Sequence, residues 1–112
     1  MKIRTDSITG SALDWAVAKC EYDELAAKNI QYPQYARFYP KISPSTSWAQ
    51  GGPIIEREAI ELVPDGKGSW SAAIRGGDED DVAHGPTPLI AAMRCYVTSR
   101  LGDEVDIPEE LV

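Results

Sequence analysis

Long apolar runs are absent from this 112-residue chain, and so are clusters of basic residues. No stretch reaches the roughly 20 apolar residues that a membrane-spanning helix needs, and residues 1–6 lack the apolar run of a secretion signal. The sequence therefore predicts a cytoplasmic protein with no membrane partner. Because the formal charge is −7 and the 11 lysine and arginine residues are scattered, direct binding to a nucleic-acid backbone is not expected.

Histidine and cysteine are also scarce, which limits the chemistry open to the chain. There is one histidine, His84, and the two cysteines, Cys20 and Cys95, lie far apart, so no zinc-site spacing can be assembled. We expect both cysteines to be buried free thiols. P-loop, dinucleotide-binding and nucleophile-elbow patterns are missing too. The sequence predicts no catalytic residue, no metal and no cofactor, and it favours a protein that is not an enzyme.

Acidic residues, by contrast, are abundant and unevenly placed. Half of the 18 lie in residues 78–81 and in the last ten residues, 103–112. The run at 78–81 lacks the alternate spacing and closing glutamate of an EF-hand loop, so we interpret it as a solvated loop. We expect the acidic tail, 103–112, to lack regular structure.

The apolar residues are sufficient for one hydrophobic core, and we expect residues 1–112 to form a single domain. A first helix is predicted to follow Ser11, its expected N-cap, with Asp14 in a position like that of a capping box. Its apolar residues recur at helical spacing and predict a buried stripe. That stripe consists of Leu13, Ala16, Val17 and Cys20.

Residues 22–44 differ in composition from the rest of the chain. They contain four of the five tyrosines, the only phenylalanine and three prolines. Because proline restricts regular structure, the sequence predicts an irregular segment here, with at most one edge strand. Its rings either hold a loop against the core or form an aromatic contact surface.

A second helix is predicted near residues 47–58, but two starting points are open. Ser45 and Ser47 offer N-caps ahead of Trp48, whereas Gly51-Gly52-Pro53 should disturb a helix. Either the helix begins at Pro53, or a turn at 47–50 leads into it through a kink.

The remaining signals predict a hairpin and a last helix. Residues 60–63 and 69–75 flank a turn at 64–68, which indicates an antiparallel pair. Thr87 and the proline after it mark the start of the last helix, and Gly102 marks its end. The predicted fold class is α+β, a small antiparallel sheet sandwiched or covered by about three helices.

Three stretches resemble a known protein family. They are LDWAVAKC at 13–20, SPSTSWAQGGPIIERE at 43–58, and HGPTPLIAAMRCY at 84–96 with GDEV at 102–105. These motifs resemble the NinX family of small early-region proteins of lambda-like bacteriophages. The resemblance implies a bacteriophage protein and, more distantly, a small phage domain in which helices sandwich a sheet. It implies no reaction, cofactor or catalytic residue.

Four residues are candidate binding residues: Trp48, Arg57, His84 and Thr87. Arg57 either reaches a partner's carboxylate or phosphate, with Trp48 beside it as an anchor, or pairs internally and fixes the kinked helix to the sheet. His84 and Thr87 precede a helix N-terminus, where they form either an ordinary surface turn or a small anion pocket.

The sequence therefore favours a non-catalytic protein-interaction module in the cytoplasm of an infected bacterial host. Its partner would be a host or phage protein, and homodimerisation is an allied expectation. The alternative is a small-ligand or anion-binding domain, or a minor enzyme, with its site near His84, Thr87 and Arg57. A concave pocket lined by these three residues would favour that alternative.

Overall fold

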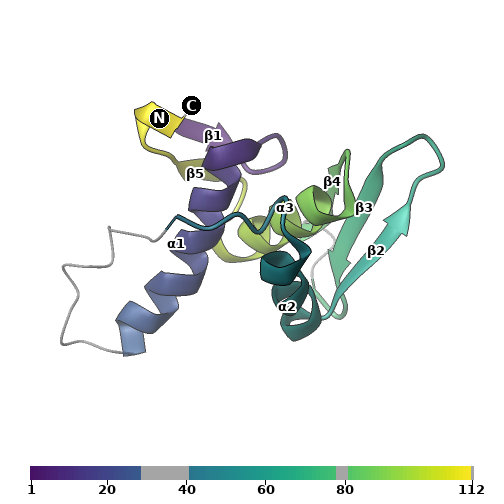
Figure 1. Ribbon diagram of the computed structural model, residues 1–112, viewed down its shortest axis with the longest axis horizontal. Helices are drawn as coiled ribbons and strands as arrows, with labels where there is room; N and C mark the ends of the chain where they lie inside the picture. Colours follow the sequence, from purple (N-terminus) through teal and green to yellow (C-terminus); the bar gives the residue numbers. More distant parts are fainter. Residues whose placement is uncertain (29–40, 78–80, 112) are drawn as a thin grey trace.

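The computed structural model describes residues 1–28, 41–77 and 81–111, which form three α-helices, one short 3-10 helix and two antiparallel sheets (Figure 1). The elements are β1 (Lys2–Arg4), α1 (Gly10–Lys28), α2 (Trp48–Glu58), β2 (Ile60–Pro64), β3 (Trp70–Ile74), β4 (Ala83–Gly85), α3 (Pro88–Leu101), β5 (Glu104–Asp106) and the 3-10 helix Glu109–Leu111. The predicted α+β fold class is confirmed, with two small sheets where one was expected. No helix of the described residues is long and apolar enough to cross a membrane.

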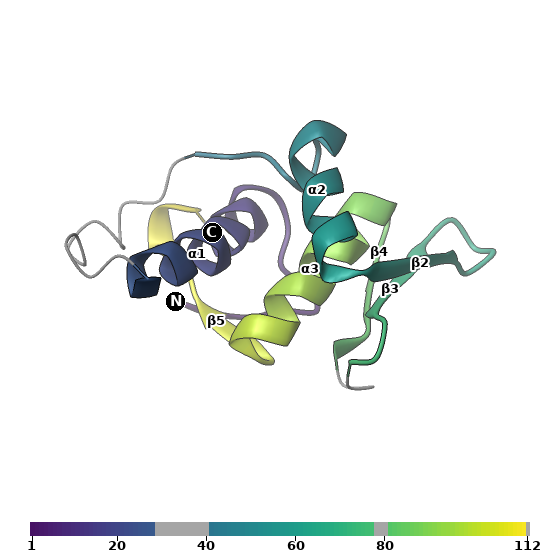
Figure 2. The same cartoon turned by 90° about the horizontal axis from the view of Figure 1, so that it is seen from below.

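Helix α3 lies at the centre of the fold. Residues 91–98 are all buried, since α1 lies on one side of the helix and the three-stranded sheet on the other, with α2 also in contact (Figures 1 and 2). Both predicted ends are confirmed. The Thr87 hydroxyl accepts a hydrogen bond from the Ile90 amide at 3.1 Å, and Gly102 ends the helix with φ of 83°. A helix covered on several sides has little polar surface, which explains the apolar run within it.

The predicted hairpin is confirmed as strands β2 and β3. Ile60 pairs with Ile74 and Pro64 with Trp70, and β4 adds a third strand through the pairing of Ala72 with Ala83. Ala72 is completely buried, so its side of the sheet faces α3. The sequence did not predict β4, because three residues next to an acidic loop carry too little alternation to indicate a strand.

Helix α1 confirms the predicted buried stripe but not the predicted cap. The helix begins at Gly10, so Ser11 lies inside it and the prediction that Ser11 is the N-cap is wrong. The Asp14 carboxylate accepts a hydrogen bond from the Ser45 amide at 2.9 Å. Asp14 thus holds the segment before α2 against α1, a long-range role that local spacing cannot reveal.

Helix α1 also continues to Lys28, so the irregular segment does not begin at residue 22 as predicted. Residues 23–28 contain leucine, alanine, glutamate and lysine and no proline, which favours a helix. Residues 29–40, which hold most of the tyrosine-rich segment, lie outside the described residues, as do residues 78–80 of the acidic run. Their roles stay predictions.

Helix α2 starts at Trp48 and runs through Pro53, so the alternative start at Pro53 is wrong. Proline removes the hydrogen bond to the carbonyl of Ala49, four residues before it. Ala49 is exposed, so water can satisfy that carbonyl. The helix ends at Glu58, and its C-cap is Ala59, whose φ of 54° is in the left-handed region.

The acidic tail is ordered, contrary to prediction. Strand β5 pairs antiparallel with β1, with Val105 opposite Ile3, and both Val105 and Ile107 are buried. The segment from Glu104 to Ile107 alternates acidic and apolar residues, which is the pattern of a half-buried strand. This pairing brings the two ends of the described chain side by side (Figure 1).

Candidate functional site

Arg57 lies at the centre of a charged cluster that joins all three α-helices. Its guanidinium makes two hydrogen bonds to Glu21 of α1, the shorter of 2.7 Å, and one to Glu58 at 3.0 Å. It also donates to the Tyr96 hydroxyl of α3 at 3.3 Å. Arg100 completes the cluster with an ion pair of 2.7 Å to Glu58.

The ring of Tyr96 lies close to both arginines of this cluster. The guanidinium carbons of Arg57 and Arg100 are 5.7 Å and 5.4 Å from the ring centroid, within the range of a cation–π contact. The hydrogen bonds to Glu21 raise the pKa of Arg57 above its ordinary value, and burial raises the pKa of Tyr96. Of the two alternatives for Arg57, the internal pairing is present, but it fixes α2 to α1 and α3 and not to the sheet.

Trp48 opens α2 and is 56% exposed. Ala49 and Pro53 are exposed on the same side of the helix, and Gly52 is half-buried between them. Trp48 and Gly52 are four residues apart, as are Ala49 and Pro53, which places the two pairs in neighbouring rows on this side of the helix. We call Trp48, Ala49, Gly52 and Pro53 the outer face of α2. The opposite side, with Gly51 and Ile54, is buried.

His84 and Thr87 lie at the entrance of α3, away from Arg57. His84 is exposed on β4 opposite Ser71, and the Thr87 hydroxyl is used by the helix cap. Tyr96, which Arg57 contacts, is nine residues after Thr87, or roughly 13 Å along the helix axis. No hydrogen bond or ion pair within the described residues joins Arg57 to either of them. The structure therefore does not bring these three predicted residues into one site.

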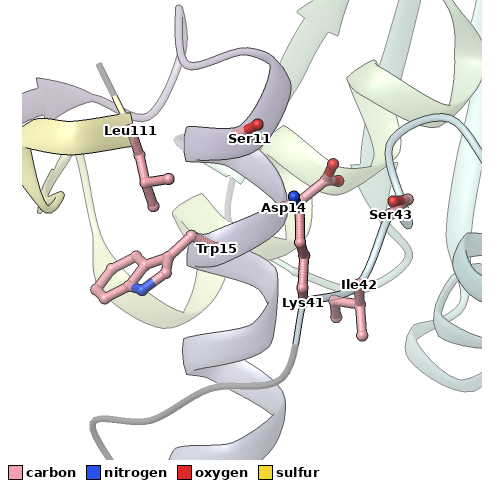
Figure 3. A pocket seen from close by; sticks show the side chains of 7 residues that line it. All are labelled: Ser11, Asp14, Trp15, Lys41, Ile42, Ser43 and Leu111. Atoms are coloured by element: carbon pink, nitrogen blue, oxygen red, sulfur yellow. The ribbon is translucent and has the colours of Figure 1, made fainter.

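A concave pocket of about 320 Å³ lies elsewhere, beside α1 (Figure 3). It is lined by Ser11, Asp14, Trp15, Lys41, Ile42, Ser43 and Leu111. Figure 3 shows Trp15 directed toward Leu111, with Asp14 on the other side of the helix, toward Ser43. The pocket thus combines an indole, a carboxylate and an ammonium group, and it is near the lower end of the range for small-molecule sites. Sequence patterns could not indicate it, because its residues come from three separate segments.

Arg94 is the buried charge that the sequence analysis missed. It lies within α3 and is only 9% exposed. Its guanidinium donates to the carbonyl of Ile8 at 2.9 Å and to that of His84 at 2.8 Å. Burial lowers the pKa of Arg94, opposed by the nearby carboxylate of Asp6. The one available signal was a single charged residue in the otherwise uncharged stretch 88–99.

The two cysteines are buried free thiols, as predicted. Burial raises the pKa of Cys20 to about 12 and that of Cys95 to about 11. The thiolate is the reactive form of cysteine. At a pH well below the pKa, each unit by which the pKa rises lowers the thiolate fraction tenfold. At pH 8 we therefore expect iodoacetamide to alkylate the folded protein on the order of 100-fold more slowly than the urea-unfolded protein. Equal rates for the two states, measured by mass spectrometry, would contradict this.

These observations define a small α+β protein built around one buried helix and carrying a charged cluster that joins its α-helices. A family model described as bacteriophage P22, NinX matches residues 4–100. The chain belongs to the NinX family of bacteriophage P22, and the resemblance inferred from its motifs is confirmed. No curated protein matches the chain.

Proposed function

We propose that this bacteriophage protein is a non-catalytic interaction module, which binds a host or phage protein through the outer face of α2 in the cytoplasm of the infected cell. The observation that carries the proposal is the exposure of Trp48 at 56% on a helix whose opposite side is already buried. Tryptophan is enriched among the residues that contribute most to binding at protein interfaces. An apolar stripe on the outside of a packed helix fits a surface that another protein covers.

The rigid attachment of α2 supports the same proposal. At one end, Gly51 packs so closely that an added Cβ would lie 2.5 Å from the Pro44 carbonyl oxygen and 2.7 Å from Leu89. At the other end, Arg57 holds the helix to Glu21. A surface held in position before binding loses less conformational entropy on association. On this account Arg57 positions the surface and does not itself reach a partner.

Affinity capture from infected cells tests the proposal. Tagged protein is expected to retain one host or phage protein in stoichiometric amount, and Trp48→Ala is expected to lose it. Val82→Ala is the matched control, because Val82 is another exposed apolar residue, at 40%, and it is not on α2. Retention by Trp48→Ala would exclude the outer face of α2 as the surface, and the absence of any captured protein would remove the main support for an interaction module.

The pocket beside α1 favours a second candidate, a small-ligand site, in place of the predicted site near His84, Thr87 and Arg57. Its Asp14 carboxylate and the Lys41 ammonium would suit a zwitterionic molecule, and Trp15 would suit a flat or apolar group. Fragment screening by NMR tests this candidate. Chemical-shift changes confined to Ser11, Trp15 and Ser43 are expected if it holds, whereas shifts spread over the surface would contradict it.

A further inference from the structure

Strand β2 forms one edge of the three-stranded sheet. Two hydrogen bonds show which of its backbone amides and carbonyls face the neighbouring strand β3. The Arg75 amide donates to the Ala59 carbonyl at 3.1 Å, and the Asp65 amide donates to the Ser69 carbonyl at 3.0 Å. In an antiparallel pair, the residues that bond to the partner strand alternate with residues that point away from it. The backbone groups that point away from β3 are those of Ile60, Leu62 and Pro64.

The two edges of this sheet differ. At the β4 edge, the guanidinium of Arg94 donates to the His84 carbonyl, so a side chain satisfies the backbone there. At the β2 edge, the outward amides and carbonyls of Ile60 and Leu62 have no hydrogen-bond partner among the described residues. The β2–β3 hairpin also projects from the body at the end opposite α1 (Figures 1 and 2). An unpaired edge of this kind is a template for another strand.

We propose that a second copy of this chain pairs antiparallel with β2 about a two-fold axis at Leu62, which joins the two sheets into one of six strands. Leu62 then exchanges two hydrogen bonds with Leu62 of the partner subunit. The Ile60 amide donates to the carbonyl of Pro64 on the partner, and the symmetric bond forms as well. Two of the four hydrogen bonds use the Pro64 carbonyls, and none needs an amide at that position.

Charge selects this register over its neighbour. Glu61 and Val63 alternate along β2 with the residues whose backbone groups point away from β3. Because successive side chains of a strand point to opposite faces, the Glu61 and Val63 side chains lie on the face of the sheet away from α3. A shift of the axis to Glu61 would place that residue directly opposite its own copy, and like charges in that position are destabilising. With the axis at Leu62, each Glu61 lies opposite Val63 of the partner subunit and the repulsion is avoided.

A hollow at the start of β2 lies beside the position of the second copy's turn. It has a volume of about 590 Å³ and is lined by Ala59, Ile60, Glu61 and Arg75. In the proposed register, Asp65 of the partner subunit lies opposite Ala59, so the partner's turn begins next to this hollow. Glu61 contributes a carboxylate to the hollow, and the turn carries the cation Lys67. The charges at this edge therefore suit a second copy of the same chain.

Two substitutions at the exposed Val63 test the pairing and its register. Val63→Lys would place an ammonium opposite the partner's Glu61, and Val63→Glu would place a carboxylate there, twice in each dimer. By sedimentation equilibrium, we expect a dimer whose dissociation constant falls about fivefold in Val63→Lys and rises about fivefold in Val63→Glu. Circular dichroism of each variant checks that the monomer fold is kept.

Val82→Lys and Val82→Glu are the matched controls, because Val82 is another exposed valine, at 40%, and the net charge changes by the same amount. Their dissociation constants are expected to stay close to that of the parent protein. A monomer at all concentrations up to about 1 mM, or a dimer that responds at Val82 and not at Val63, would overturn the proposal.

Hydrogen exchange supplies an independent readout within the same strand. The amides of Ile60 and Leu62 are expected to become protected as protein concentration rises, because they have no hydrogen-bond partner among the described residues of the monomer and are bonded in the dimer. The amides of Glu61 and Val63, which face β3, are the internal reference and should change little. Equal protection of all four amides at every concentration would contradict edge pairing. Because this edge and the outer face of α2 are separate surfaces, either proposal can fail without the other.

Discussion

Replacing Arg94 with methionine is expected to lower the free energy of unfolding by about 3 kcal/mol, since hydrogen bonds to charged groups contribute about 1.5–3 kcal/mol each. The substitution keeps an unbranched stem in the core but leaves the carbonyls of Ile8 and His84 without their donor. Removing a desolvated charge offsets part of this loss. Urea denaturation followed by circular dichroism measures the change.

Lys2→Met is the control for this experiment, because the Lys2 side chain is exposed and makes no hydrogen bond or ion pair with the described residues. Its effect is expected to stay within about 0.5 kcal/mol. A change of similar size in both variants would mean that the buried guanidinium of Arg94 is not what holds β4 and the segment before α1 to α3.

Gly51→Ala is expected to destabilise the protein by about 1–3 kcal/mol, the usual range for overpacking. The new Cβ would lie 2.5 Å from the backbone oxygen of Pro44 and 2.7 Å from Leu89, so α2 must move away from its support. We also expect weaker capture of the partner, because the outer face of α2 moves with the helix. Thermal unfolding and affinity capture measure the two effects separately.

The neighbouring glycine provides an internal control of opposite sign. A Cβ added at Gly52 would meet nothing within 4 Å. Alanine is a better helix former than glycine by up to about 1 kcal/mol, so Gly52→Ala is expected to stabilise the protein. Destabilisation by both substitutions would show that the helix itself, and not the contact at Gly51, is sensitive to change.

The elements that were predicted correctly are those with strong local signals. The buried stripe of α1, the hairpin around the turn at 64–68 and both ends of α3 depend on periodicity or on residues within one turn of chain. The missed elements have weak local signals. Strands β1, β4 and β5 have three residues each, and their pairing is set by tertiary contacts.

The site was harder to predict than the fold. Arg57 and Glu21 are 36 residues apart, and Arg94 and Ile8 are 86 apart, so neither contact has a local pattern. Pro53 left two predictions open, a helix that begins at Pro53 or a turn at 47–50 that leads into it through a kink, because proline propensity says nothing of the close packing at Gly51. The exposure of Trp48 also depends on which side of α2 the body covers, and only the fold decides that.

Crosslinking from the outer face of α2 during infection tests the central claim most directly. A photo-reactive amino acid at Ala49 is expected to form an adduct with one host or phage protein, identified by mass spectrometry. The same amino acid at Lys2, which is exposed on β1, is expected to form no such adduct. An absence of adducts from position 49, or the same adducts from both positions, would contradict the account of this protein as an interaction module that binds through α2.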